Sequence, residues 1–132
     1  MASWNYVWDA GETQIIATGG GWSTLSGTTE IYSNAIDFAT DGELGAAIHF
    51  EVNFDVTPTD HVDFKLYGSN DNSTWDRVAF RTIRLDKATD TNITTHVVEG
   101  NRPYVRVGAA QSGATDSHDV RCYHKQYTGE NA

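Results

Sequence analysis

The stretch HVDFKLYGSNDNSTWD (His61–Asp76) predicts a β-hairpin, and with it the structural class of the chain. Val62, Phe64 and Leu66 alternate with polar or amphipathic residues, as expected for a strand with one buried face. The run GSNDNS that follows consists of residue types that adopt positive φ or hydrogen-bond to their own backbone. The chain can therefore reverse there, before Trp75 returns to apolar surroundings.

Segments with the same period of two lie on both sides of this hairpin. The longest is Leu44–Val56, in which every second residue from Ile48 to Val56 is apolar, and it predicts a central strand that ends before Pro58. Irregular spacing within Thr29–Phe38 and a change of parity between Phe80 and Ile83 indicate β-bulges. The remaining strands are expected at Thr13–Thr18, Thr29–Phe38, Trp75–Leu85, Ile93–Val98, Arg102–Ala110 and Asp119–Tyr127.

About eight strands with no helical period predict an all-β chain, folded as a single-domain antiparallel β-sandwich or jelly roll. A chain of 132 residues is long enough to bury one core. We expect an N-terminal arm or first strand over residues 1–12, the sandwich domain over 13–127 and a flexible tail over 128–132.

Charge and composition exclude several classes of partner. The formal net charge of -9 opposes binding to nucleic acid and to anionic membranes. No apolar run approaches the length of a membrane span, and the first residues lack the features of a signal peptide, so the mature chain is expected to begin near residue 1. Cys122 is the single cysteine and cannot form an intramolecular disulfide.

The sequence contains no motif that predicts catalysis. The five histidines do not form a metal-binding motif, and Ser117, His118 and Asp119 are adjacent on an extended chain, so they cannot form a triad. Asn70-Asp71-Asn72 offers oxygen ligands for calcium, but a turn that caps its own backbone explains the same residues. We therefore expect no enzymatic activity, no catalytic residue, no metal and no cofactor.

Two groups of side chains are candidates for binding a partner. Trp4, Tyr6 and Trp8 would form an aromatic stripe, which packs either on the body of the domain or on a neighbouring subunit. Arginines on the outward faces of strands predict either ion pairs between strands or a partner surface, and they lie at positions 81, 84, 102, 106 and 121. The predicted partner-binding residues are Trp4, Tyr6, Trp8, Arg81, Arg84, Arg102 and Arg106.

Three segments carry a resemblance to known proteins: DFKLYGSNDNSTWD (Asp63–Asp76), NRPYVRV (Asn101–Val107) and SGATD (Ser112–Asp116). Their order resembles small structural proteins of tailed bacteriophages, above all the β-sandwich proteins that decorate or cement the capsid. The likeness covers residues 60–125. The same order is also similar to discoidin-type jelly rolls, which bind glycans or lipid head groups, but the terminal disulfide pair usual in those domains is absent here.

The resemblance implies a non-enzymatic virion structural protein at the capsid surface, assembled in the host cytoplasm. Its partners would be the major capsid protein and further copies of itself, arranged as a trimer, with the N-terminal arm reaching a neighbour. The alternatives are a tail or fibre component that mediates attachment, or a carbohydrate-binding module that uses Trp22, Trp75 and Tyr127 as stacking platforms for a glycan.

Overall fold

The computed structural model describes residues 4–9, 11–17, 20–40, 43–87 and 91–131, and every regular element in these ranges is a β-strand. The sequence prediction of an all-β chain is confirmed. The strands are β1 (Trp4–Trp8), β2 (Thr13–Ile16), β3 (Ser23–Thr24), β4 (Ile31–Tyr32), β5 (Ile36–Asp37), β6 (Gly45–Asn53), β7 (Val62–Ser69), β8 (Arg81–Leu85), β9 (Thr91–Glu99), β10 (Tyr104–Gln111) and β11 (Asp119–Asn131).

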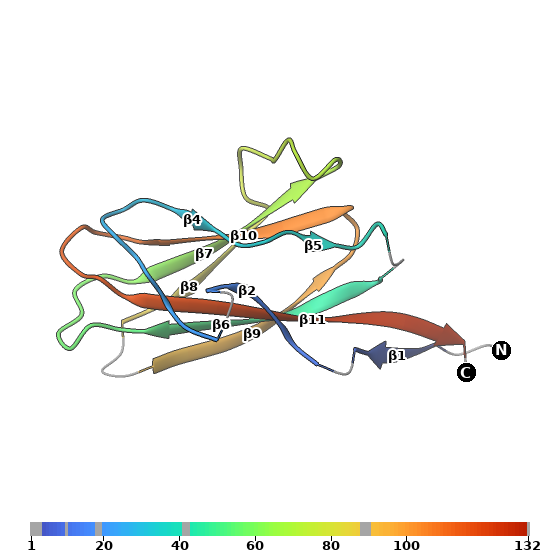
Figure 1. The fold of residues 1–132 in the computed structure, drawn as a ribbon, viewed down its shortest axis with the longest axis horizontal. Helices are drawn as coiled ribbons and strands as arrows, with labels where there is room; N and C mark the ends of the chain where they lie inside the picture. Colours follow the sequence, from blue (N-terminus) through green and yellow to red (C-terminus); the bar gives the residue numbers. More distant parts are fainter. Residues whose placement is uncertain (1–3, 10, 18–19, 41–42, 88–90, 132) are drawn as a thin grey trace.

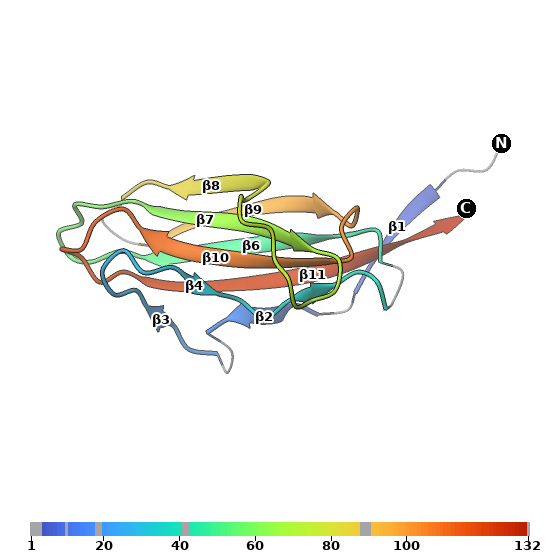
Figure 2. The ribbon, with the colours of Figure 1, turned by 90° about the horizontal axis from the view of Figure 1, so that it is seen from above.

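The strands form two antiparallel sheets that pack face to face as a β-sandwich (Figures 1 and 2). The first sheet has the order β1-β11-β6-β9, and β2 and β3 also pair with β11. The second has the order β4-β10-β7-β8, and β5 also pairs with β10. The predicted antiparallel sandwich is thus confirmed. The strand number exceeds the predicted eight because the sequence pattern does not reveal two-residue strands.

The core lies between the two sheets and is built by alternation. Ile48, Phe50 and Val52 of β6 are fully buried, as predicted for the central strand, and they face Phe64 and its neighbours on β7. The rings of Phe50 and Phe64 lie 4.9 Å apart between centroids and join the sheets directly. Val56 was predicted to continue this face, but it is 96% exposed because β6 ends at Asn53.

The predicted hairpin at 61–76 is present but wider than the sequence indicated. β7 pairs with β8 from Val62↔Leu85 to Leu66↔Arg81, while Trp75 makes only an isolated bridge to Ser69. The chain leaves the sheet between these points, so Val78 is exposed. This excursion explains the change of parity that was interpreted as a bulge. The other irregular segment, Thr29–Phe38, splits into β4 and β5, which both pair with β10.

Both termini lie at one end of the sandwich, where β1 and the end of β11 extend beyond the body as a two-stranded ribbon (Figures 1 and 2). The pairing runs from Trp4↔Asn131 to Trp8↔Tyr127. The sequence prediction ended the last strand at Tyr127 and placed a flexible tail after it. Instead, β11 continues to Asn131, because β1 supplies the hydrogen-bonding partner that this segment lacks on its own.

We expect Phe50→Ala to lower the free energy of unfolding by about 3–5 kcal/mol, because it removes a fully buried ring and leaves a cavity between the sheets. Urea unfolding followed by circular dichroism measures this change. Val56→Ala is the matched control, because that side chain is almost fully exposed and its loss should leave the stability close to that of the wild type. Equal effects of the two substitutions would contradict the position of the core.

Candidate interaction surface

The five arginines singled out in the sequence divide into two groups. Arg84 forms an ion pair with Asp63, at 3.0 Å, and Arg121 forms one with Glu51, so these two link neighbouring strands within a sheet. In the described part of the chain, no ion pair joins Arg81, Arg102 or Arg106 to a carboxylate. The chain has twice as many acidic as basic residues, so three arginines without an ion pair are notable, and their surroundings are described next.

Two of these arginines lie in one groove at the base of the ribbon, where the open edges of the two sheets meet. The groove has a volume of about 490 Å³. Side chains from β1, β8, β9 and β11 and from the turn after β9 line it: Trp8, Phe80, Arg81, Val97, Val98, Glu99, Asn101, Arg102 and Tyr127. We call it the ribbon groove. It brings together three predicted partner residues, Trp8, Arg81 and Arg102, from distant parts of the sequence.

Aromatic rings hold the shape of the ribbon groove. Trp8 packs on Tyr127 with the ring centroids 4.8 Å apart, and Trp8 remains 43% exposed. The ring of Tyr127 lies across Gly45, where an added Cβ would come within 2.5 Å of its hydroxyl oxygen. A glycine at this position of β6 therefore allows the ring to close the groove floor.

The two arginines are oriented by contacts that leave most of their donors free. The Arg102 guanidinium stacks over Phe80, 3.7 Å from the ring centroid, and donates to Asn101 Oδ1 at 2.9 Å. Its side chain passes over Gly68, where any Cβ would collide with it. Arg81 donates to the backbone oxygen of Val97 at 3.1 Å and so connects β8 to β9. Stacked or pinned in this way, both groups lose less conformational entropy when they bind a partner.

The groove continues along the open edge of β9. Because Val97 O accepts from Arg81, it points away from β6, and alternation places the backbone groups of Ile93 and Thr95 on the same open side. Ile93 and Val97 are each 52% exposed. An edge strand with exposed β-branched side chains is a template for pairing with another chain unless something covers it. Leu44, 46% exposed, adds apolar surface beside Tyr127 in the adjoining hollow.

The other predicted site residues lie elsewhere. Arg84 is exposed on the outer face of the second sheet, in its ion pair with Asp63, and Arg106 lies on β10 among aromatic rings. Trp4 and Tyr6 belong to β1 by their backbone, and their side chains fall outside the described part of the structure. No sequence pattern predicted that Phe80 and Val97 would lie beside Trp8, because only the meeting of two sheet edges places them together.

The described side chains include one cluster with the composition of a metal site, Asp60, Asp116 and His118, whose ligand atoms lie within 4.8 Å of one another. The backbone N–H of Asp55 donates to His118 Nδ1 at 3.1 Å, so a neutral ring carries its proton on Nε2. That atom lies 3.2 Å from Asp116 Oδ2. A metal bound at Nε2 would require the tautomer that carries its proton on Nδ1, and the hydrogen bond from the Asp55 N–H would then be lost.

The same cluster has a clear structural role. Asp116 Oδ2 accepts from the Thr59 backbone N–H at 2.7 Å, the Thr59 hydroxyl at 3.1 Å and the Asp60 N–H at 2.9 Å. These bonds, with that from the Thr59 N–H the largest, lower the pKa of the Asp116 carboxyl below its ordinary value. The cluster therefore joins the loop after β6 to the loop after β10.

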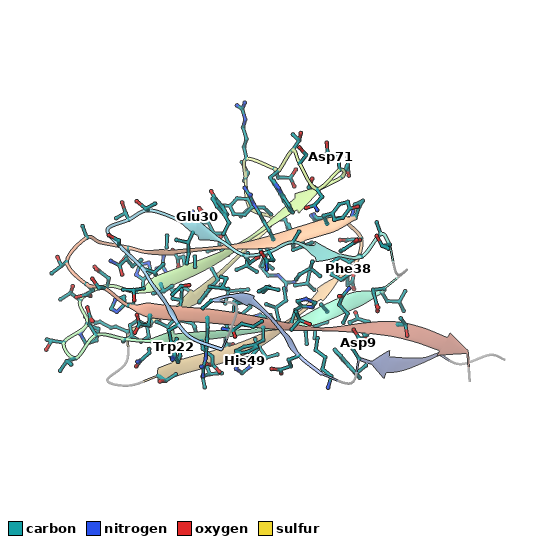
Figure 3. All side chains as sticks on the ribbon, in the orientation of Figure 1. Asp9, Trp22, Glu30, Phe38, His49 and Asp71 are labelled. Carbon is teal, nitrogen blue, oxygen red and sulfur yellow. The ribbon has the colours of Figure 1, made fainter. Side chains whose placement is uncertain are left out.

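The loop at Asn70-Asp71-Asn72 is similarly explained by its own backbone. Asp71 Oδ1 accepts from the N–H groups of Ser73 and Thr74 at 2.9 and 2.8 Å, and Ser69 Oγ donates to it. These bonds lower the pKa of Asp71. The loop stands out from the end of β7 (Figure 3). Its geometry is that of a self-capped turn, which was the alternative to calcium binding in the sequence.

The aromatic side chains suggested as stacking platforms are all in contact with other side chains. Arg121 lies over Trp22, 4.0 Å from the ring centroid, Arg106 lies over Trp75 at 4.7 Å, and Trp8 packs on Tyr127. Trp22 and His49 lie on the side of the first sheet, and Glu30 lies beside β4 of the second sheet (Figure 3).

In the described ranges, no helix is long and apolar enough to span a membrane.

Comparison with known proteins adds support for the fold alone. No protein-family model matches this sequence, and no curated protein matches it. The chain is similar to a solved structure described as "Bacillus endospore appendages form a novel family of disulfide-linked pili". The TM-score is 0.54 at 17% identity, and the match covers 96% of this chain and 90% of that chain.

We expect the folded protein to lose stability in acid when the Asp116 carboxylate becomes protonated. Because its pKa is lower in the folded chain, the stability it contributes is complete above its unfolded pKa, near 3.8, and is lost as the pH falls through the folded value. Urea midpoints measured between about pH 6 and about pH 2.5 should fall at the acid end. Asp116→Asn should unfold more easily at neutral pH and depend less on pH, whereas Glu12→Gln, at an exposed site, should follow the wild type.

We expect the Cys122 thiol to be unreactive in the folded protein. The side chain is fully buried, and burial raises the pKa of its thiol. We expect no reaction with Ellman's reagent at pH 8 in buffer and one equivalent of reaction in urea. Because the chain has a single cysteine, a covalent dimer of the native protein on a non-reducing gel would contradict this burial.

Proposed function

We propose that this chain is a non-enzymatic structural protein of a bacteriophage virion, and that it decorates the capsid and stabilises the shell. The resemblance of residues 60–125 to capsid decoration proteins is the reason for choosing this assembly. Its partners would be the major capsid protein and further copies of itself in a trimer, with the protein at the capsid surface. A tail or fibre component that mediates attachment remains the alternative within the same class.

The observation that carries the proposal is that several groups able to bind another protein lie together at one end of the sandwich. The ribbon groove combines two arginines without ion pairs, an exposed tryptophan and the open edge of β9. Arginine and aromatic residues are enriched among those that dominate binding energy in protein interfaces. The projecting ribbon gives this end the reach to contact a neighbouring subunit, as the sequence predicted for the N-terminal arm.

The fold is suited to a rigid building block. The described strands bury their apolar faces in one continuous core between the sheets, and their outward faces carry the polar contacts. Such a body needs neither a reactive cleft nor a cofactor to act in an assembly. The similar fold of a pilus protein shows that a sandwich of this size occurs in extended protein assemblies, although it does not identify the assembly to which this chain belongs.

The ribbon groove predicts that Trp8→Ala and Arg102→Ala each weaken attachment to undecorated particles by at least tenfold, because each removes an anchor side chain at the centre of the interface. Occupancy after mixing with particles that lack this protein, measured on quantitative gels and by negative-stain imaging, tests this prediction. Arg84→Ala is the matched control, because Arg84 is already paired with Asp63 on another face.

Removal of residues 1–10 tests the ribbon as a whole, since it deletes β1 and exposes the end of β11. We expect occupancy to fall and the trimer to dissociate in sedimentation. Undiminished binding of this truncated chain, together with full binding by the Trp8→Ala and Arg102→Ala variants, would end the proposal that this end contacts the shell.

A further inference from the structure

The third arginine without an ion pair, Arg106, lies on β10 and does not line the ribbon groove. Aromatic side chains surround it. Val105 and Val107 are fully buried, so Arg106 points to the outer face of the second sheet. Its guanidinium carbon lies 3.9 Å from the ring centroid of Tyr32, 4.7 Å from that of Trp75 and 6.0 Å from that of Tyr67. We call these four residues the aromatic cluster.

The guanidinium of the aromatic cluster has no hydrogen-bond acceptor for its inner donor. Arg106 Nε is buried and has no partner among the described residues. Stacking on aromatic faces uses the π surface of the guanidinium and leaves the N–H groups in its plane free. In-plane donors of this kind pair best with a planar carboxylate, which accepts two parallel hydrogen bonds.

One acidic side chain on the same face of the second sheet is engaged with another residue. Glu30 accepts hydrogen bonds from the Tyr67 hydroxyl at 2.7 Å and 3.0 Å to its two carboxylate oxygens. Its carboxylate lies directly over Gly108, two residues along β10 on the same face as Arg106, where a Cβ would collide with it. Glu30 is therefore held on the same face of the sheet as Arg106, with no ion pair between the two among the described residues, and each carboxylate oxygen has capacity to accept a further hydrogen bond.

The exposed ring of Tyr32 is a third feature of the aromatic cluster that a ligand could contact. Tyr32 is 50% exposed, so about half of its surface is open to solvent beside Arg106. Sugar rings pack their C–H faces on aromatic rings, and their hydroxyl groups donate to carboxylates. An acidic peptide side chain would use the guanidinium alone, whereas an acidic sugar would use the guanidinium, the ring and Glu30 together.

From this geometry we infer that the aromatic cluster is a binding site for a carboxylate-bearing sugar, with Arg106 binding the carboxylate, Tyr32 packing on the sugar ring and Glu30 accepting from hydroxyl groups. The site is on the outer face of the second sheet, separate from the ribbon groove at the base of the ribbon. It does not depend on the proposed function, because a virion protein and a free carbohydrate-binding module could both carry it.

The test uses the full chain and a glucuronate tetrasaccharide as the probe, followed by the indole N–H resonance of Trp75 in a two-dimensional NMR titration. We expect saturable shifts of that resonance. Glucose oligomers of the same length and acetate should each bind at least tenfold more weakly, because the glucose oligomers lack the carboxylate and acetate lacks the sugar ring and its hydroxyl groups. Equal affinity for the uncharged oligomer, or for acetate, would overturn the assignment to an acidic sugar.

Variants of the chain separate the guanidinium from the rest of the site. Arg106→Gln should reduce the affinity for the glucuronate probe at least tenfold, and Arg106→Lys should reduce it to a lesser degree, because lysine keeps the charge but lacks the planar fork. Arg84→Gln, a paired arginine on the same face of the sheet, should bind as the wild type does. Unchanged binding by a folded Arg106→Gln chain would overturn the inference.

Tyr32→Ala provides a second measurement if Arg106→Gln fails to fold, because the Tyr32 side chain is half exposed. It should reduce the affinity for the glucuronate probe while leaving the weak response to acetate unchanged, since the ring contacts the sugar and not the carboxylate. An equal loss for both probes would overturn the role given to Tyr32. None of these variants touches the ribbon groove, so particle occupancy should stay at the wild-type level and the two proposals can fail separately.

Discussion

The contact between Phe50 of β6 and Phe64 of β7 is the constraint on which the rest of the structure depends. Its two rings, 4.9 Å apart between centroids, fix the spacing of the sheets at their centre. Both strands lie between two others of their sheet, β6 between β11 and β9 and β7 between β10 and β8. Once the inward faces are committed to this core, the outward faces and the sheet edges are the only surfaces left for binding.

The same constraint explains why unsatisfied groups gather where they do. Two outward arginines on strands pair with acids on the neighbouring strand, Arg84 with Asp63 and Arg121 with Glu51. At the edges there is no neighbouring strand, and Arg81 reaches the backbone of β9 instead. Arg102 stacks on Phe80 beyond the end of the sheet. The ribbon groove is thus a consequence of where the two sheets stop.

Polar groups inside the loops serve the fold and leave the edges free for function. Asp116, with its pKa lowered by backbone donors, ties two loops together, and Asp71 organises its own turn. Asp71 was a candidate calcium ligand in the sequence and Asp116 belongs to a cluster with the composition of a metal site in the structure, and each already accepts hydrogen bonds from backbone N–H groups. Arg106 is the opposite case, because its neighbours stack on it without accepting its hydrogen bonds. A group ordered by its surroundings but not satisfied by them is the one prepared for a ligand.

Period-two alternation in the sequence determined the all-β class, the central strand with Phe50 and the hairpin after His61, because a strand with one buried face has an apolar residue at every second position. Residue type predicted Trp8, Arg81 and Arg102 as partner residues, and the ribbon groove brings these three together. The alternation misplaced Val56, because an apolar residue beyond the end of a strand looks like its continuation. Only the tertiary structure decided that β1 would extend β11 to Asn131, that Arg84 would be paired and Arg106 would not, and that the edges of β8 and β9 would meet. Such contacts join residues far apart in the chain, and local periodicity contains no information about which strands become neighbours.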